Sequence, residues 1–177
     1  MKYVAFMRAI NVGGNSIVSM AAIKEAMEGI GLSDVRTYIN SGNVVFSTRA
    51  TGAEKVALAI EKAIERRTGL AVKVVVLSRA ALTKVVDAIP ARWVDDKVMR
   101  CYVLLLWKEA DNGKILTQLP SNPAVDELRY ASGAVIWRVD RKDLGKSRMT
   151  RLIGTPIYKQ LTMRSANTIR KLNELMA

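Results

Sequence analysis

Arg8-Ala9-Ile10-Asn11-Val12-Gly13-Gly14-Asn15 is the stretch that decides how the start of this chain folds. An apolar strand pattern, Tyr3–Met7, precedes it, and a helical pattern that begins near Ser19 follows it. Glycine and asparagine tolerate positive φ, so this stretch predicts a sharp turn between a strand and a helix. A second stretch of the same character, Tyr38-Ile39-Asn40-Ser41-Gly42-Asn43, separates two further strand patterns.

The patterns around these two stretches predict a ferredoxin-like sandwich in the first half of the chain. Residues of high strand propensity occur in four runs, at Tyr3–Met7, Val35–Ile39, Val44–Ser47 and Ala71–Leu77. Apolar residues at helical spacing predict helices over residues 20–30 and 53–67, which end at Gly31 and Gly69. The order β-α-β-β-α-β is that of a split βαβ sandwich. We therefore expect one antiparallel sheet with both helices on one face.

The second half repeats this plan less clearly. A third helix, Arg79–Ile89, is expected to end at Pro90. Beyond it lie a strand, a short helix and a hairpin, at Met99–Trp107, Asp111–Leu119, Val125–Tyr130 and Val135–Val139. The residues after them are basic and partly helical in pattern, which gives a degenerate β-α-β-β-α unit. The sequence therefore predicts an α+β fold, with a ferredoxin-like subdomain at residues 1–91 and a second, degenerate ferredoxin-like half at residues 92–177.

Composition excludes several classes of protein. No apolar run approaches the ~18 residues of a membrane-spanning helix, and the first residues lack the layout of a signal peptide. Cys101 is the single cysteine, so no internal disulfide forms and we expect a reducing cytoplasm. The sequence contains no histidine, the usual general base and the commonest metal ligand. We therefore expect no metal, no cofactor and no membrane partner.

The charge of the chain is positive and unevenly distributed. The formal net charge is +12, from 28 Lys and Arg against 16 Asp and Glu. Residues 138–177 contain ten basic residues and three acids, a net charge of +7. Such asymmetry favours an anionic partner, and it favours nucleic acid in particular through the release of counterions. The alternative is a basic surface that has no specific ligand.

The expected topology places the two glycine- and asparagine-containing stretches at the same end of the sheet. In a split βαβ unit the first and second strands run parallel, so the loop after the first and the turn after the second are neighbours. Backbone N–H groups at the start of the first helix favour anions there. Turn formation alone explains the glycines, but it explains Arg8 less well, because Arg8 ends an apolar strand. The candidate ligand-binding residues here are Arg8, Asn11, Gly13, Gly14, Asn15, Asn40, Ser41 and Asn43.

Gly145-Lys146-Ser147 is similar to the end of a phosphate-binding P-loop. That motif needs a further glycine five residues before Gly145, and Asp140 occupies the position. We therefore reject a P-loop. Lys146 and Arg148 remain candidates for contact with an anion without that geometry.

Three motifs resemble signatures of the bacterial domain-of-unknown-function 1697 family. They are residues 4–14, Tyr38–Phe46 and Met163–Thr168, the last followed by Leu172. The resemblance covers nearly the whole chain and implies an α+β protein with two ferredoxin-like halves and no assigned activity. The family usually has Asn and Trp where this chain has Ser165 and Ala166. The matching positions, which the resemblance adds to the candidate ligand-binding residues, are Arg164, Asn167 and Thr168.

Three functions remain open on the sequence. They are a binding module for a phosphorylated ligand or a nucleic-acid backbone, a metal-independent enzyme acting on a phosphorylated small molecule, and a protein–protein interaction domain. A ferredoxin-like sheet binds RNA by stacking bases on exposed aromatic side chains. The predicted strands carry few aromatic residues and no recognisable RNA-binding motif, so we favour binding to phosphate groups. The sequence assigns neither a catalytic residue nor an oligomeric state.

Overall fold

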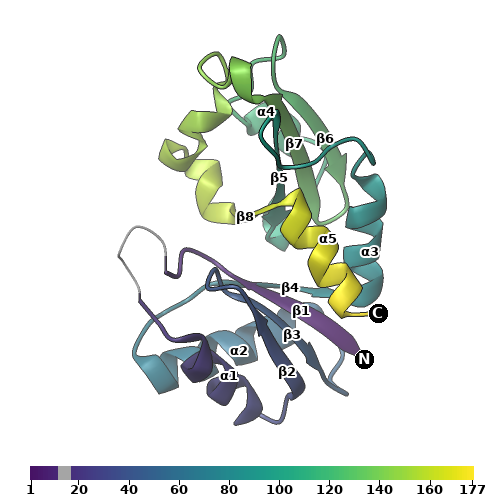
Figure 1. Cartoon of the computed structure of the whole chain (residues 1–177). Helices are drawn as coiled ribbons and strands as arrows, with labels where there is room; N and C mark the ends of the chain where they lie inside the picture. The colour runs from purple at the N-terminus through teal and green to yellow at the C-terminus, as the bar shows by residue number, and fades with distance from the viewer. Residues whose placement is uncertain (12–16) are drawn as a thin grey trace. The chain divides into compact units, whose positions relative to one another are not determined.

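A computed structural model describes residues 1–11 and 17–177 of the chain. These residues form two compact units, Met1–Ala80 with Glu174–Ala177, and Ala81–Asn173. The sequence instead suggests a boundary between residues 91 and 92, and that boundary stays a prediction. Each unit contains one four-stranded antiparallel sheet (Figure 1).

The first unit is the expected ferredoxin-like sandwich. Its elements are β1 (Lys2–Met7), α1 (Met20–Glu28), β2 (Ser33–Tyr38), β3 (Asn43–Ser47), α2 (Ala53–Thr68) and β4 (Val74–Ser78). The strand order is β2-β3-β1-β4, and every neighbouring pair is antiparallel. β1 therefore runs parallel to β2 with β3 between them, so the loop after β1 and the turn after β2 lie at the same end of the sheet.

Both helices cover one face of this sheet, as predicted (Figure 1). α1 buries Ile23 and Met27, and α2 buries Ile60 and Ile64. These four side chains belong to one hydrophobic core with strand residues of that face, namely Tyr3, Ala5, Met7, Val44, Phe46, Val74 and Val76. Burial of the two amphipathic helices against a single sheet face fixes the layer order of the unit.

Local sequence sets where these helices begin and end. The Ser19 hydroxyl accepts a hydrogen bond from the Ala22 N–H (3.0 Å), so Ser19 is the N-cap of α1. Gly69 ends α2 in the left-handed region, at φ 73°. α1 ends slightly earlier than expected, at Glu28, and Gly31 (φ 82°) lies in the turn that follows it.

The second unit repeats the strand order of the first. Its elements are α3 (Arg79–Ala88), β5 (Met99–Leu106), α4 (Ile115–Gln118), β6 (Glu127–Ala131), β7 (Ala134–Asp140), β8 (Leu161–Ser165) and α5 (Ala166–Leu175). Short 3-10 helices connect them: η1 (Lys108–Ala110), η2 (Arg141–Asp143), η3 (Met149–Gly154) and η4 (Pro156–Gln160). The order β6-β7-β5-β8 corresponds strand for strand to β2-β3-β1-β4, which confirms a degenerate ferredoxin-like half.

The sequence pattern predicts no strand at β8, but residues Leu161–Ser165 form one in the structure. Leu161 and Met163 pack in the core on one face of the sheet, so Thr162 and Arg164 lie on the other. This alternation spans only five residues inside a basic region, so it is a weak strand signal. Antiparallel pairing with β5, from Tyr102 opposite Ser165 to Leu106 opposite Leu161, supplies the hydrogen bonds that make the segment a strand.

Between β7 and β8, the second long helix of a ferredoxin-like unit is replaced by η2, η3 and η4. Met149, Leu152 and Ile157 of this segment are buried in the core with side chains of β5 and β7. Three apolar contacts spaced along the segment hold its backbone against the sheet without a continuous helix.

A buried carboxylate fixes the start of the same segment. Asp126 Oδ1 accepts hydrogen bonds from Trp137 Nε1 (2.9 Å) and from Ser147 Oγ (2.6 Å). Asp126 Oδ2 accepts one from the Asn122 N–H (2.7 Å). Hydrogen bonds to a buried carboxylate are among the stronger ones in proteins, so this network ties residues 122, 137 and 147 together.

None of the helices in the described ranges is both long and apolar enough to cross a membrane.

Asp126→Asn should destabilise the protein, because an NH2 group would replace one of the two carboxylate oxygens. Both oxygens accept hydrogen bonds, so at least one of the present donors would face this NH2 group and lose its acceptor. Leaving a buried hydrogen-bonding group unsatisfied costs about 1–3 kcal/mol, and more where a charge is involved. We expect the free energy of unfolding, measured by urea denaturation, to fall by at least about 2 kcal/mol.

The control for this variant is Glu28→Gln, the same change on the surface. Glu28 pairs with Lys24 at 3.7 Å, and both side chains are about half exposed. Such a pair contributes roughly 0.5 kcal/mol or less. Equal, small losses in the two variants would show that the Asp126 network does not hold the segment.

Candidate functional site

One asparagine joins the loop after β1 to the turn after β2. Asn11 Nδ2 donates to Asn40 O (3.0 Å) and to Val18 O (2.9 Å), and Asn11 Oδ1 accepts from the Val18 N–H (2.9 Å). Asn11 has a φ of 53°, in the left-handed region that asparagine tolerates better than most residues. The two stretches therefore lie side by side in the first unit, and the Asn11 amide holds them there.

Other candidates of this cluster also take part in the fold. Asn43 is fully buried, and its Nδ2 donates to Tyr38 O (3.1 Å). Arg8 is half-buried, and its backbone N–H donates to Lys73 O (2.8 Å). Asn40 is exposed and Ser41 half-buried in the turn. The candidates Gly13, Gly14 and Asn15 lie outside the described residues, and a ligand-binding role for this cluster stays a prediction.

Gly42 allows the turn to pack directly against β1. Its φ is 73°, and its carbonyl accepts the Met7 N–H (2.8 Å). A Cβ at this position would lie 2.7 Å from Met7 Cβ and 2.7 Å from Ile10 Cδ1. Met7 Cβ is fixed by the strand, so no larger residue fits there without a shift of the backbone.

The C-terminal motif forms the junction between β8 and α5 in the second unit. Ser165 Oγ accepts the Thr168 N–H (3.2 Å) and lies 3.0 Å from Thr168 Oγ1. Asn167 Nδ2 donates to Asp95 O (2.8 Å), and its Oδ1 accepts from the Asp95 N–H (3.3 Å). Ser165, Asn167 and Thr168 thus fix the start of the helix and tie it to the loop before β5.

Arg164 is buried within β8. Its Nη1 donates to Thr162 Oγ1 (3.0 Å) and to Met163 O (2.7 Å). Burial lowers the pKa of its guanidinium to about 10, so the group is still charged at neutral pH. The buried position of Arg164 favours a structural contribution, and its role toward a ligand stays a prediction.

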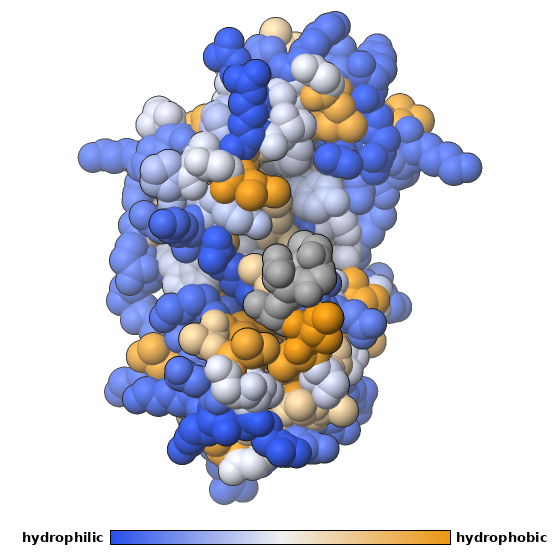
Figure 2. All heavy atoms as spheres, turned by 90° about the vertical axis from the view of Figure 1, so that its left-hand side faces the viewer, coloured by the Kyte–Doolittle hydropathy of each residue, from blue (hydrophilic) through white to orange (hydrophobic). Residues whose placement is uncertain are grey.

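Residues 141–160 form an exposed positive surface of the second unit, which we call the basic segment. It contains six basic residues and one acid, Asp143, and residues 144–173 contain no acid at all. Five of the six are exposed: Lys142, Lys146, Arg148, Arg151 and Lys159. Figure 2 views the side on which this segment lies in Figure 1, and long hydrophilic side chains project there.

Some charges of the basic segment are neutralised within the second unit. Arg141 pairs with Asp95 (3.0 Å), and Lys146 pairs with Asp143 (2.9 Å). Four others make no ion pair within the part of the chain that the structure describes, namely Lys142, Arg148, Arg151 and Lys159. These four cations are therefore open to an external anion.

The sequence-based candidates include Lys146 and Arg148 but omit Lys142, Arg151 and Lys159. The structure places all five on one exposed segment. A signal for this is present in the sequence, because the apolar residues Met149, Leu152 and Ile157 lie between the basic ones, and that pattern is typical of a surface segment anchored to a core. Ser147 is one of the anchors, because its hydroxyl donates to buried Asp126, which directs it away from any phosphate bound outside.

Cys101 is enclosed in β5 and offers no nucleophile. Its side chain is fully buried, and burial raises the pKa of the thiol to about 11, so the thiol is protonated at neutral pH. In the described ranges, no three acidic or cysteine side chains come together in a way that could hold a metal ion.

Gly42→Ala should destabilise the protein more than Gly69→Ala does. Both glycines have a φ of 73°, so both variants strain the backbone, but no atom lies within 4 Å of the position of a Cβ at Gly69. Overlap with Met7 and Ile10 adds about 1–3 kcal/mol at Gly42. Urea denaturation measures the difference, and equal losses would mean that the turn moves away from β1 at little cost.

The stability of the protein should fall as the pH rises from about 9 to about 11, because of Cys101. The thiolate is disfavoured in the folded state, so the unfolded chain loses its proton first and is stabilised by rising pH. Chemical denaturation at several pH values should reveal this slope, and Cys101→Ala should remove part of it. Identical slopes in the two proteins would contradict a raised thiol pKa.

Comparison with known proteins supports the fold and the family. No curated protein matches the chain. In fold, the chain is similar to the conserved bacterial protein SP0830 from Streptococcus pneumoniae, with a TM-score of 0.84 and 24% sequence identity over 99% of this chain and 98% of that one. The model of a family described as protein of unknown function (DUF1697) matches residues 1–137. The chain therefore belongs to the DUF1697 family, whose function is unknown.

Proposed function

We propose that this protein is a binding module for the phosphate groups of an anionic ligand, with a nucleic-acid backbone as the partner that fits best. The observation that supports the proposal is the basic segment, residues 141–160. Four of its exposed cations have no ion pair in the described part of the chain, and no acid occurs from residue 144 to 173.

The backbone of the basic segment is already ordered without a ligand. Met149, Leu152 and Ile157 are buried, and Ser147 is bound to Asp126. Binding of a ligand therefore needs to immobilise side chains but not the backbone, which lowers the entropic cost of binding. Arg148 and Arg151 each offer a planar guanidinium that can form two parallel hydrogen bonds with a phosphate.

The composition of the segment favours contacts with phosphates over contacts with bases. Tyr158 is its only aromatic residue and is half-buried, so the segment has no exposed aromatic platform for base stacking. Contacts with phosphates position a nucleic acid but carry no sequence information. We therefore expect weak sequence specificity and strong dependence on salt. The reducing cytoplasm expected from the single cysteine contains such polyanions.

Replacement of the four open cations by glutamine should weaken nucleic-acid binding and its salt dependence. Each neutralised phosphate contributes a slope of roughly −0.9 on duplex DNA, and about −0.7 on single strands, to log affinity against log salt concentration. The variant Lys142→Gln/Arg148→Gln/Arg151→Gln/Lys159→Gln should reduce the magnitude of the duplex slope by up to about 3.6. Fluorescence anisotropy with short labelled DNA and RNA, in a series of salt concentrations, measures both quantities.

A variant with the same change in charge on the first unit serves as the control. Lys55, Lys62, Arg66 and Arg67 are exposed on α2, and their replacement by glutamine also removes two Lys and two Arg. This control should keep most of the wild-type affinity and slope. Equal losses in both variants would assign binding to net charge alone, and no detectable binding of wild type at low salt would rule out the nucleic-acid partner.

A further inference from the structure

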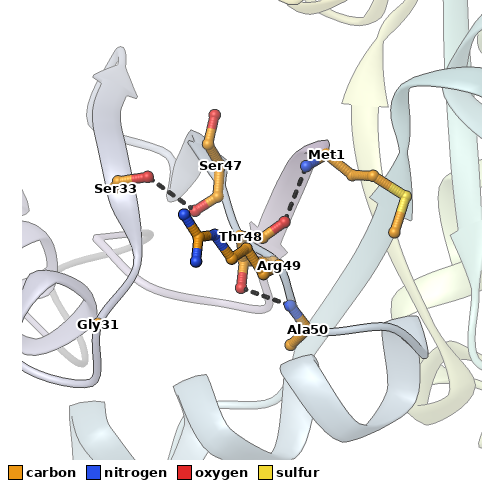
Figure 3. A pocket seen from close by; sticks show the side chains of 7 residues that line it. All are labelled: Met1, Gly31, Ser33, Ser47, Thr48, Arg49 and Ala50. Atoms are coloured by element: carbon orange, nitrogen blue, oxygen red, sulfur yellow. Dashed lines mark hydrogen bonds between the residues drawn. The ribbon is translucent and has the colours of Figure 1, made fainter.

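A hollow in the first unit, far in sequence from the basic segment, is lined by polar groups. It has a volume of about 320 Å³, at the lower end of the ~300–1,000 Å³ range of small-ligand pockets. It lies where β2 begins and β3 ends, and its lining residues are Met1, Gly31, Ser33, Ser47, Thr48, Arg49 and Ala50 (Figure 3).

An irregularity in the sheet shapes this hollow. Ser33 is opposite Ser47, but the register between β2 and β3 shifts between Ser33 and Arg36. Asp34, within the shifted part, has a φ of 53°. A bulge of this kind bends the strand and ends regular pairing, and bulges often occur next to binding sites. The hollow lies beside this irregularity.

The lining of the hollow is rich in hydrogen-bond donors and contains no acidic residue. Ser33, Ser47 and Thr48 supply three hydroxyl groups, and Arg49 supplies a guanidinium. Thr48 Oγ1 accepts the Ala50 N–H (3.1 Å), which leaves the Thr48 hydroxyl proton to be donated elsewhere. The Ser33 hydroxyl donates to Ser47 O over a long 3.4 Å, so this bond is easily exchanged for a stronger one.

Arg49 is the only charged side chain among the lining residues. It is exposed, and it makes no hydrogen bond or ion pair with any residue that the structure describes. Figure 3 shows its guanidinium on the side of Ser33 and of the Ser47 carbonyl. A guanidinium on the same side as the Ser33 hydroxyl, at the edge of a hollow, is suited to an anion with several oxygen atoms.

We propose that this hollow binds a phosphoryl group, as inorganic phosphate or as the phosphate of a small metabolite. The Arg49 guanidinium has five N–H donors and the Ser33 hydroxyl adds one, which is more than the two oxygen atoms of a carboxylate accept, whereas a phosphate has oxygen atoms for all of them. The hollow belongs to the first unit and the basic segment to the second, and they differ in kind, because the hollow suits a compact group and the basic segment offers an extended row of charges. The two proposed sites can therefore be tested independently of each other.

Titration with inorganic phosphate, followed by two-dimensional amide NMR, tests the proposal. A chloride salt is used to hold the ionic strength constant, so that no amide signal shifts merely because charge screening changes during the titration. The amide signals of Ser47, Thr48, Arg49 and Ala50 should shift and saturate. Acetate at the same concentrations should produce much smaller shifts, and a sugar phosphate should reproduce those of phosphate if the natural ligand is a metabolite.

Two variants locate the site. Arg49→Gln should weaken phosphate binding at least tenfold, and Ser33→Ala should weaken it less; both residues are exposed, so both variants should fold. The matched control is Arg66→Gln, an exposed arginine on α2 that does not line the hollow and should bind like wild type. The variant lacking the four cations of the basic segment should also bind phosphate normally.

Two results would overturn the proposal. One is an absence of saturable shifts at residues 47–50 in wild type. The other is an affinity of Arg49→Gln for phosphate equal to that of wild type. Neither result would affect the proposed binding of nucleic acid, which is measured separately through the basic segment.

Discussion

Each unit of this protein depends on a central strand that is hydrogen-bonded along both edges. β1 pairs with β3 and β4, and β5 pairs with β7 and β8, in every case antiparallel. A buried strand must satisfy its backbone N–H and C=O groups, and here the partners come from segments far away in sequence. This requirement brings the ends of β1 and β2 together, and it makes a strand of Leu161–Ser165 inside a basic region. These strand pairings therefore set the positions of the loops that carry the candidate sites.

Polar residues that suggest a ligand site in the sequence are often engaged within the fold. The amides of Asn11 and Asn167 each bind backbone groups of a neighbouring loop, and Asn43 is buried beneath a turn. Residues engaged in this way position loops, and a ligand would have to displace their hydrogen bonds. Lys142, Arg148, Arg151, Lys159 and Arg49 differ, because each is exposed and forms no ion pair in the described part of the chain. Binding an anion at these residues therefore breaks no ion pair already present.

The two proposed anion sites use different physical principles. The basic segment is an open row of cations on an ordered backbone, which suits a long polyanion and gives affinity through counterion release. The hollow near Arg49 combines one cation with hydroxyl groups, which suits a compact phosphate and gives affinity through directed hydrogen bonds. High salt should weaken the first kind of binding much more than the second, since screening acts mainly on exposed charges.

The sequence by itself determined the α+β class, the order of elements in the first unit, the helix cap at Ser19, the helix end at Gly69 and the concentration of positive charge after residue 138. Each of these depends on local propensity, on the period of apolar residues or on composition, which neighbouring residues carry. The tertiary structure alone decided that β8 is a strand, that buried Asp126 anchors the basic segment, and that Arg49 lies over a hollow at a bulge. These features depend on partners distant in the chain, such as β5 for β8 and Ser147 for Asp126, and no local pattern specifies such partners.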